Sequence, residues 1–284
     1  MMRVVLAGAF GHLGRDILKE LVKQGHEVIA LDAMEREVEL QGSGRFTFHK
    51  IDCRKPETMA GLCDGADVVI TTMGLTKASK ELSCYDIDLK GNQNLLEEAK
   101  RGGAKKFIYI SVIHADSHPE IPMLDAKAKM ENLVKESGIP YIIYRPTGYF
   151  YDIVHVLKPM VEKGAIRLLG KTSGVANVIA TEDFAEYIVS HFGEENRTIS
   201  IGGKETYTYD EMAKICFDAV GKPCVIKRAP AWLFDVLIWI NTMKKTGKAD
   251  IIKFSKFTLV GNLVGDVSYG KQSFREYLTR EIRK

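Results

Sequence analysis

Three glycines near the start of the chain have the spacing of a backbone site for phosphate. Gly8, Gly11 and Gly14 follow the apolar stretch 4–7 and lead into a segment whose apolar residues recur at helical spacing. Glycine lets the backbone turn sharply and lets a ligand approach it closely, and free N–H groups at the start of a helix attract negative charge. This order of strand, turn and helix predicts a pyrophosphate site more than a turn that serves packing alone. The turn residues expected to contact the ligand are Gly8, Ala9, Phe10, Gly11, His12, Leu13 and Gly14.

Asp32 ends the second apolar stretch, 18 residues after Gly14. At this position a dinucleotide-binding fold has an acidic residue that accepts hydrogen bonds from the ribose hydroxyls of the adenosine. A carboxylate repels the additional phosphate of NADP, so Asp32 favours NAD as the cofactor. Arg36 lies close enough in the sequence to leave NADP open, and a solvated strand end is the alternative interpretation of Asp32.

Alternating strands and helices follow the glycine turn, and these elements must position the residues above. Short β-branched stretches predict strands at residues 4–7, 26–32, 46–51, 67–71, 106–111 and 141–144. Helices are predicted after the glycine turn and at residues 82–100 and 123–136. The pattern is typical of an α/β fold of Rossmann type, in which helices cover both faces of a doubly wound parallel sheet.

From residue 146 onward the alternation becomes irregular. The predicted elements there are helices at 151–162, 182–192 and 209–220 and a strand at 198–201. We therefore expect an NAD(P)-binding domain over residues 1–150 and a small α+β cap over residues 151–284, packed on the same sheet as one structural unit. Ligands of doubly wound folds bind at the carboxyl ends of the strands, so this lobe would close over that edge.

Composition and charge argue against several classes of protein. The 284 residues carry a formal charge of only +3, with Lys and Arg spread along the chain, so nucleic acid is not an expected partner. Five cysteines without a Cys-x-x-Cys pair do not indicate a disulfide framework, and no metal site is expected. No apolar run approaches the roughly 20 residues that span a bilayer, and the chain begins directly with a strand. We therefore expect a cytoplasmic protein, as a monomer or a homodimer.

Several segments along the chain occur in an order that is more specific than any one of them. They are residues 8–14, 88–99, 107–111, Lys127 with Glu131, and residues 137–141, 144–148 and 180–185. In this order they resemble the atypical, extended-type short-chain dehydrogenase/reductases, and within these the NmrA-like group and its sugar-epimerase relatives. The resemblance covers nearly the whole chain and implies a bound NAD(P) cofactor.

The resemblance also implies roles for residues beyond the glycine turn. The positions that it assigns to the cofactor are Asp52 and Cys53 near the adenine, Thr72, Met73 and Gly74 after the fourth strand, Lys127 at the nicotinamide ribose, and Pro146 and Thr147 near the nicotinamide. A helix-capping or surface acid is the alternative interpretation of Asp52. Lys129 competes directly with Lys127 for the role of the lysine.

The chain departs from the family pattern at the residues that usually move a proton. Members that transfer hydride usually have a tyrosine four residues before the lysine, because the ammonium lowers the pKa of the phenol. Here that position is Met123, and the usual serine or threonine near Ile113 is absent. Ser111, slightly upstream, is the hydroxyl available at the cofactor. Some NmrA-like reductases lack the tyrosine and keep the lysine, so the resemblance still allows catalysis.

Three residues could replace the missing tyrosine beside the catalytic Lys127. His114 follows the fifth strand, and histidine exchanges protons near neutral pH. Tyr149 and Tyr151 follow the segment 144–148 and could reach a substrate over the nicotinamide. A surface loop position explains His114 at least as well, and a packing role explains either tyrosine equally well.

Residues 231–240 form the most apolar stretch of the chain and include both tryptophans, Trp232 and Trp239. A helix here would be apolar almost all round, so we expect most of the segment up to Ile240 to be buried in the cap. Contact with another subunit or a lipid surface is the alternative, and the lysines at 244, 245 and 248 suit an interfacial helix. An apolar cap also favours an apolar substrate, such as a quinone.

Three functions remain open from the sequence. The first is an NAD(P)-dependent oxidoreductase that acts on a small apolar carbonyl or quinone-type substrate, with Lys127 at the ribose. The second is a non-catalytic dinucleotide-binding sensor or an assembly or regulatory protein, in which the cofactor orders the cap. The third is a nucleotide-sugar epimerase, which comes last because it also relies on the missing tyrosine.

Overall fold

The computed structural model describes residues 1–75, 82–170, 174–230, 232–244 and 248–284. The strands of its largest sheet are β1 (Arg3–Ala7), β2 (Glu27–Asp32), β3 (Arg45–Lys50), β4 (Val68–Thr71), β5 (Phe107–Ile110), β6 (Tyr141–Pro146), β9 (Arg197–Gly202) and β13 (Val267–Ser268). Their spatial order is β3-β2-β1-β4-β5-β6-β9-β13. From β1 the strand order runs to β2 and β3 on one side and to β4, β5 and β6 on the other, so the switch point of the topology lies between β1 and β4. The predicted α/β fold of Rossmann type is confirmed.

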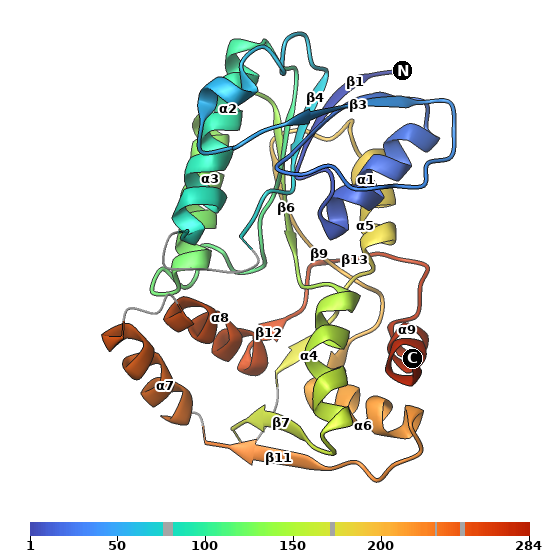
Figure 1. Ribbon diagram of the computed structural model, residues 1–284, viewed down its shortest axis with the longest axis vertical. Coiled ribbons are helices and arrows are strands. Elements are labelled where there is room, and N and C mark those ends of the chain that lie inside the picture. The colour runs from blue at the N-terminus through green and yellow to red at the C-terminus, as the bar shows by residue number, and fades with distance from the viewer. Residues whose placement is uncertain (76–81, 171–173, 231, 245–247) are drawn as a thin grey trace. The chain divides into compact units, whose positions relative to one another are not determined.

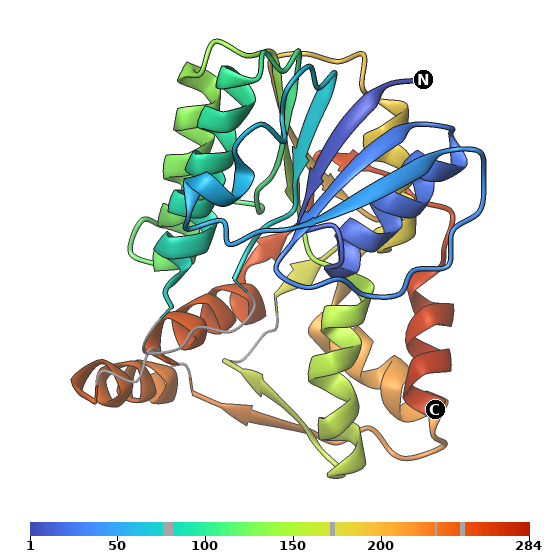
Figure 2. The same ribbon diagram turned by 45° about the horizontal axis from the view of Figure 1, so that its top comes forward.

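Helices cover both faces of this sheet. The helices α1 (His12–Lys23) and α5 (Thr181–Ser190) lie on one face, and α2 (Asn92–Arg101) and α3 (Pro122–Glu136) lie on the other (Figure 1, Figure 2). The helix predicted over residues 82–100 is divided in the structure. A π-helix over Tyr85–Gly91 runs directly into α2.

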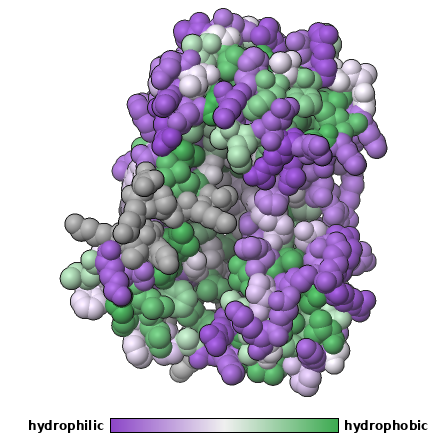
Figure 3. All heavy atoms as spheres, in the orientation of Figure 1, coloured by the Kyte–Doolittle hydropathy of each residue, from purple (hydrophilic) through white to green (hydrophobic). Residues whose placement is uncertain are grey.

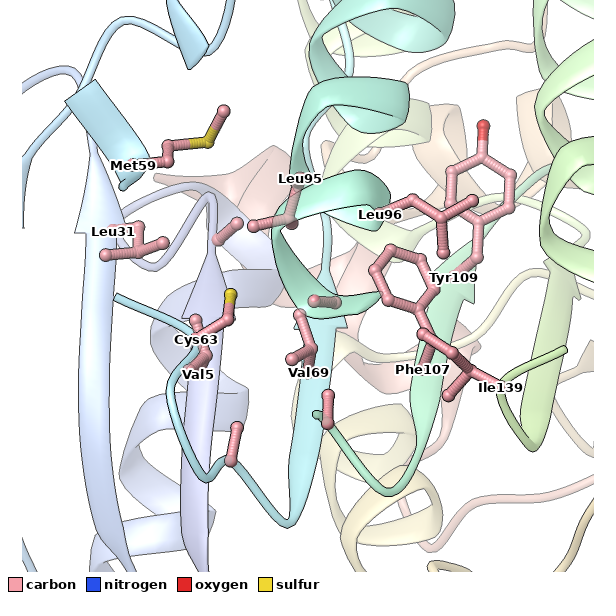
Figure 4. Packing of buried hydrophobic residues seen from close by; sticks show 14 of the residues in the cluster. Val5, Leu31, Met59, Cys63, Val69, Leu95, Leu96, Phe107, Tyr109 and Ile139 are labelled. Atoms are coloured by element: carbon pink, nitrogen blue, oxygen red, sulfur yellow. The ribbon is translucent and has the colours of Figure 1, made fainter. Parts of the chain in front are cut away.

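An apolar core fills the layer between the sheet and α2. Val5 of β1, Val69 of β4 and Phe107 of β5 are fully buried and pack in one cluster with Leu95 and Leu96 of α2 (Figure 4). A parallel sheet is covered on both faces, which explains why its central strands β1 and β4 are continuous β-branched and aliphatic runs. The same burial fixes the carboxyl ends of the strands, where the candidate site lies.

The described residues fall into two units, and residues 184–199, which follow the predicted boundary at 150, belong to the first. The second unit holds residues 146–183 and 200–284. Its helices are α4 (Phe150–Glu162), α6 (Tyr209–Ala219), α7 (Trp232–Met243), α8 (Lys248–Val260) and α9 (Phe274–Arg283). Its short strands are β7 (Ile166–Leu169), β8 (Val175–Ala176), β10 (Tyr207–Thr208), β11 (Ile226–Ala229) and β12 (Asn262–Leu263). They form two small sheets, β10-β8-β12 and β11-β7.

The prediction that the tryptophan segment is buried in the cap is wrong. The segment forms α7, which has no buried residue, and Trp232 and Trp239 are 62% and 65% exposed. The reason is that α7 packs against α8 and turns the rest of its apolar surface outward. None of the helices within the described ranges is long and apolar enough to cross a bilayer.

Candidate dinucleotide-binding site

The glycine turn follows β1, and its glycines differ in whether the fold itself requires them. Gly8 has a φ of 77°, which favours glycine, and a Cβ on Gly14 would overlap the carbonyl oxygen of Gly8. These two glycines are therefore needed for the turn itself. Gly11 has a φ of −66°, lies at the surface, and a Cβ there would meet only the oxygen of Gly8, at 3.3 Å. The fold alone does not require glycine at position 11, so a closely approaching ligand accounts for it better.

The N-terminus of α1 suits an anion. Its N-cap residue is Gly11, no side chain caps the helix, and its first turn contains no acidic residue. The first amides of a helix carry partial positive charge and need a partner. In the same turn, Arg15 has a buried Nε for which the described residues offer no hydrogen-bond partner. These features fit the pyrophosphate of a dinucleotide.

Asp32 lies at the end of β2 and contacts the glycine turn. Its Oδ2 accepts a hydrogen bond from the amide of Phe10 at 2.9 Å, and its Oδ1 accepts one from the amide of Ala33 at 2.7 Å. Each carboxylate oxygen can accept a further bond, so the ribose hydroxyls could still be held. The ring of Phe10 is buried and packs edge-on against Phe48, with ring centroids 5.5 Å apart, so only its backbone faces the turn. The side chains of Ala9 and Leu13 are buried too, whereas His12 is exposed.

The loop after β4 is tied to the glycine turn on one side and to the π-helix on the other. The hydroxyl of Thr72 lies 3.0 Å from the carbonyl oxygen of Gly8. Asn92, which is fully buried, donates to the carbonyl of Met73 at 3.2 Å and accepts from the hydroxyl of Thr71 at 2.6 Å. The predicted residues Thr72, Met73 and Gly74 therefore lie next to the glycine turn, on a loop that is held in place.

Lys127 lies on α3, and its buried side chain ends next to the loop after β4. Its Nζ lies 3.1 Å from Oδ1 of Asp88, which is itself buried, and 3.4 Å from the carbonyl oxygen of Ile110. The other oxygen of Asp88 accepts from the amide of Leu75 at 3.0 Å. A Cβ on Gly74 would lie 3.7 Å from Nζ, so Lys127 reaches the residues predicted to line the cofactor.

Lys129 has a different environment. It is exposed, pairs with Asp125 at 2.6 Å and lies over the ring of Tyr85, 5.4 Å from its centroid. Buried charges are uncommon unless they are paired, and the buried pair belongs to Lys127. Lys127 is therefore the buried lysine beside Gly74, and its role at the cofactor stays a prediction.

The residues around the usual proton relay have other partners. The buried hydroxyl of Ser111 donates to Glu131 at 2.6 Å, and Glu131 pairs with Arg145 at 2.6 Å. Ser111 is therefore part of a buried ion-pair network. His114 is half-buried in the loop after β5 and has a φ of 58°, in the left-handed region. Met123 is half-buried one turn before Lys127 on α3 and has no proton to donate.

Pro146, Thr147 and Tyr149 belong to the second unit. Pro146 is buried at the end of β6, and the hydroxyl of Thr147 donates to the carbonyl of Asn177 at 2.8 Å. Tyr149 stacks on Tyr151 with ring centroids 5.6 Å apart. Burial, followed by the nearby Tyr151, raises the pKa of Tyr149 well above its usual range. A phenol that transfers protons near neutral pH needs a lowered pKa, so this environment disfavours Tyr149 as the proton donor.

Asp52 and Cys53 follow β3. The carboxylate of Asp52 is held by Arg54, with Nη2 and Oδ2 2.7 Å apart, and this hydrogen bond lowers the pKa of Asp52. Burial raises the pKa of the Cys53 thiol to about 11, so it remains protonated. Its sulfur packs against Gly91, where a Cβ would lie 2.6 Å away. Both residues lie beyond the end of β3, and their contact with an adenine stays a prediction.

Comparison with known proteins decides the family. A family model described as NAD(P)H-binding matches residues 8–195. The chain belongs to this NAD(P)H-binding family. The matched range contains the glycine turn, Asp32, the loop after β4 and Lys127. The predicted family resemblance and the predicted NAD(P) cofactor are therefore confirmed.

Proteins similar to this NAD(P)H-binding protein are named for different functions. It is 24% identical to the photosystem II assembly factor Ycf39 of Synechocystis sp. over 233 residues, which cover 81% of this chain and 71% of that protein. It is 27% identical to the chloroplastic divinyl chlorophyllide a 8-vinyl-reductase of Arabidopsis thaliana, covering 100% of this chain and 77% of that protein. The NADPH complex of the Escherichia coli quinone oxidoreductase QOR2 is similar in fold, with a TM-score of 0.70, 16% identity and coverage of 98% and 99%.

Two site residues of the NAD(P)H-binding protein were missed from the sequence. Asp88 holds Lys127, and Asn92 ties the β4 loop to the π-helix. Both lie in the segment 88–99 that contributed to the family resemblance, but the residue types alone assigned neither a role. An acid and an amide four residues apart are also common on the surface of an ordinary helix, so the signal was ambiguous.

Proposed function

We propose that the chain is an NAD(P)-dependent reductase that acts on a small apolar carbonyl or quinone-type substrate. The observation that carries this proposal is the buried pair of Lys127 and Asp88 beside Gly74, after the ends of β4 and β5. The similar Arabidopsis protein is named as a reductase, which supports this reaction class, and the Escherichia coli protein of similar fold is named as a quinone oxidoreductase. NAD(P)H, when bound, supplies the hydride for such a reaction.

In this proposal Lys127 binds the hydroxyls of the nicotinamide ribose. An ammonium has three donors, and two of those on Lys127 face Asp88 and Ile110, which leaves one for a ligand. Asp88 acts as a positioning residue that fixes the ammonium. The proton that accompanies the hydride comes from water or from His114, because Met123 cannot supply it.

A substrate-dependent hydride transfer tests this proposal. Purified protein is mixed with NADH or NADPH and with a panel of benzoquinones, naphthoquinones, aromatic aldehydes and aliphatic ketones. We expect one equivalent of oxidised nicotinamide for each equivalent of quinol or alcohol formed, with transfer of deuterium from cofactor labelled at C4. Tight binding of the dinucleotide without product from any member of the panel would contradict the reductase.

We further propose that NADH is preferred over NADPH because Asp32 repels the 2′-phosphate. Asp32→Ala should lower the ratio of the NADPH to the NADH dissociation constant by about tenfold, which corresponds to about 1.4 kcal/mol. Asp32 also accepts a hydrogen bond from the amide of Phe10, so its replacement disturbs the turn for both cofactors alike. The ratio of the two dissociation constants removes this shared effect. Asp32→Asn is the matched control, since it retains an acceptor and removes the charge. Tighter binding of NADPH than NADH by the unchanged protein would overturn the preference.

A second function is a dinucleotide-dependent assembly or regulatory protein. Met123 at the position of the usual tyrosine favours it, and the similar Synechocystis protein is named as a photosystem II assembly factor. In that case dinucleotide binding would persist without turnover and would change the affinity for a protein partner. The hydride-transfer experiment separates the two functions.

A further inference from the structure

Helix α7 presents an apolar face to solvent. Trp232, Val236, Trp239 and Met243 are 62%, 42%, 65% and 69% exposed. Their spacing of four, three and four residues places them on one side of a helix. Leu233 and Leu237, each 40% exposed, border this stripe. Single exposed apolar residues are ordinary, whereas a continuous row that includes both tryptophans indicates a surface that is covered in use.

The opposite side of α7 is already occupied. Phe234 and Ile238, one turn apart, are less exposed than the stripe, and α7 packs against α8. Asp235, the acid of α7, lies beside the apolar stripe, three residues after Trp232 and four before Trp239, and it pairs with Lys256 of α8 at 2.6 Å. The apolar face therefore carries no uncompensated negative charge.

The sequence around α7 is strongly basic. Residues 222–260 contain eight Lys or Arg and two Asp, a formal charge of +6, whereas the whole chain has +3, so all other residues together have −3. Lys244 follows directly after the apolar face and is exposed. Positive charge beside an apolar helix face is the arrangement that binds anionic lipid headgroups.

We propose that α7 lies flat on an anionic membrane surface, with Trp232 and Trp239 at the level of the headgroups. Tryptophan is favoured at this boundary because its ring is apolar and its N–H is polar. With 12 residues α7 is too short to span a bilayer, and interfacial helices lie in the membrane plane. A second copy of the chain is a poorer occupant, because it would bring a second basic segment, with Lys244 beside its apolar face, to the contact. The proposal concerns α7 and holds whether or not the chain is a reductase.

Tryptophan emission tests the proposal directly. Both tryptophans of the chain lie on α7, so the emission reports on this helix alone. Vesicles of phosphatidylcholine with phosphatidylglycerol should shift the emission to shorter wavelength, protect it from acrylamide and carry the protein upward in flotation. Vesicles of phosphatidylcholine alone should bind at least tenfold more weakly. Salt at about 1 M, where the screening length is about 3 Å, should weaken the anionic binding.

Leu237→Asp is the decisive variant, and Met34→Asp is its matched control. Both add one negative charge at an exposed apolar residue, and Met34, 59% exposed, lies in the first unit. Leu237→Asp should reduce the partition coefficient for anionic vesicles at least tenfold and leave the thermal melt unchanged. Met34→Asp should change the partition coefficient by less than about twofold, since one surface charge contributes little. It should also leave the thermal melt unchanged.

Three results would overturn the proposal. The first is the absence of both an emission shift and flotation with anionic vesicles. The second is equal vesicle binding by the unchanged protein and Leu237→Asp, or binding that does not depend on phosphatidylglycerol. The third is self-association without lipid that Leu237→Asp abolishes in sedimentation, which would assign the face to a second copy of the chain.

Discussion

Gly11→Val is expected to abolish dinucleotide binding and leave the fold intact. The backbone at position 11 has a φ of −66° and a ψ of 171°, which valine adopts without strain. The added side chain would project from the outer side of the turn, where the pyrophosphate is expected. We expect the dissociation constants of NADH and NADPH to rise at least a hundredfold, or about 2.7 kcal/mol, in calorimetric titration.

His12→Ala is the control for Gly11→Val. His12 is exposed in the same turn, and its replacement removes a side chain without adding bulk at the backbone. Dinucleotide affinity should change by less than about threefold. Gly14 does not serve for comparison, because any Cβ there overlaps Gly8 and would damage the turn. A folded Gly11→Val protein that binds either cofactor as tightly as the parent would remove the glycine turn from the site.

Lys127→Met should reduce turnover by about a hundredfold, because misplacement of a bound reactant by about 1 Å already has an effect of this size. Lys129→Met should be nearly silent, since Lys129 is exposed and pairs with Asp125 at the surface. The measurement is kcat/KM for the best substrate of the hydride-transfer panel. Equal and small effects of both changes would discard the role of Lys127.

Lys127→Met also leaves Asp88 as a buried carboxylate without its partner. Breaking a buried ion pair in this way costs about 3–5 kcal/mol of stability. The double variant Lys127→Met with Asp88→Asn removes the stranded charge and keeps an acceptor for the amide of Leu75. We expect it to regain most of the lost stability and to remain slow. Recovery of turnover together with stability would mean that Lys127 acts only on the fold.

Most strands of the sheet were predictable because they are buried on both faces, whereas β3, an edge strand without a buried residue, was predictable from its place after β2. All six predicted strands of the first half agree with β1 to β6 to within two residues at each end. β13 was not predicted, because two residues that pair at a sheet edge leave no periodic signal. The sequence predicts an ordinary helix where the structure has the π-helix, because the two differ in their backbone hydrogen bonds, which residue types do not show.

The sequence singles out candidate site residues where a residue is expected to act through its backbone or by its place after a strand. Gly8, Gly11 and Asp32 are of this kind. Lys127 and Lys129 could not be separated by spacing, because the difference between them is burial and the buried partner Asp88 is 39 positions away. The prediction that the tryptophan segment is buried was wrong for a related reason. A helix that is apolar all round has the same sequence whether protein or lipid covers it.

The π-helix over Tyr85–Gly91 makes the candidate site depend on the number of residues between Asp88 and Asn92. It places Asp88 against Lys127 while Asn92, in the turn that follows, bonds to the carbonyl of Met73. An α-helix turns by about 100° per residue, so deleting one residue between Asp88 and Asn92 would rotate the two side chains apart. Such a chain would still contain the acid, the amide and the lysine, and an alignment would open only a single gap. A homologue with that gap would have every residue type of the site in its sequence and yet would not hold its lysine in place as Asp88 holds Lys127.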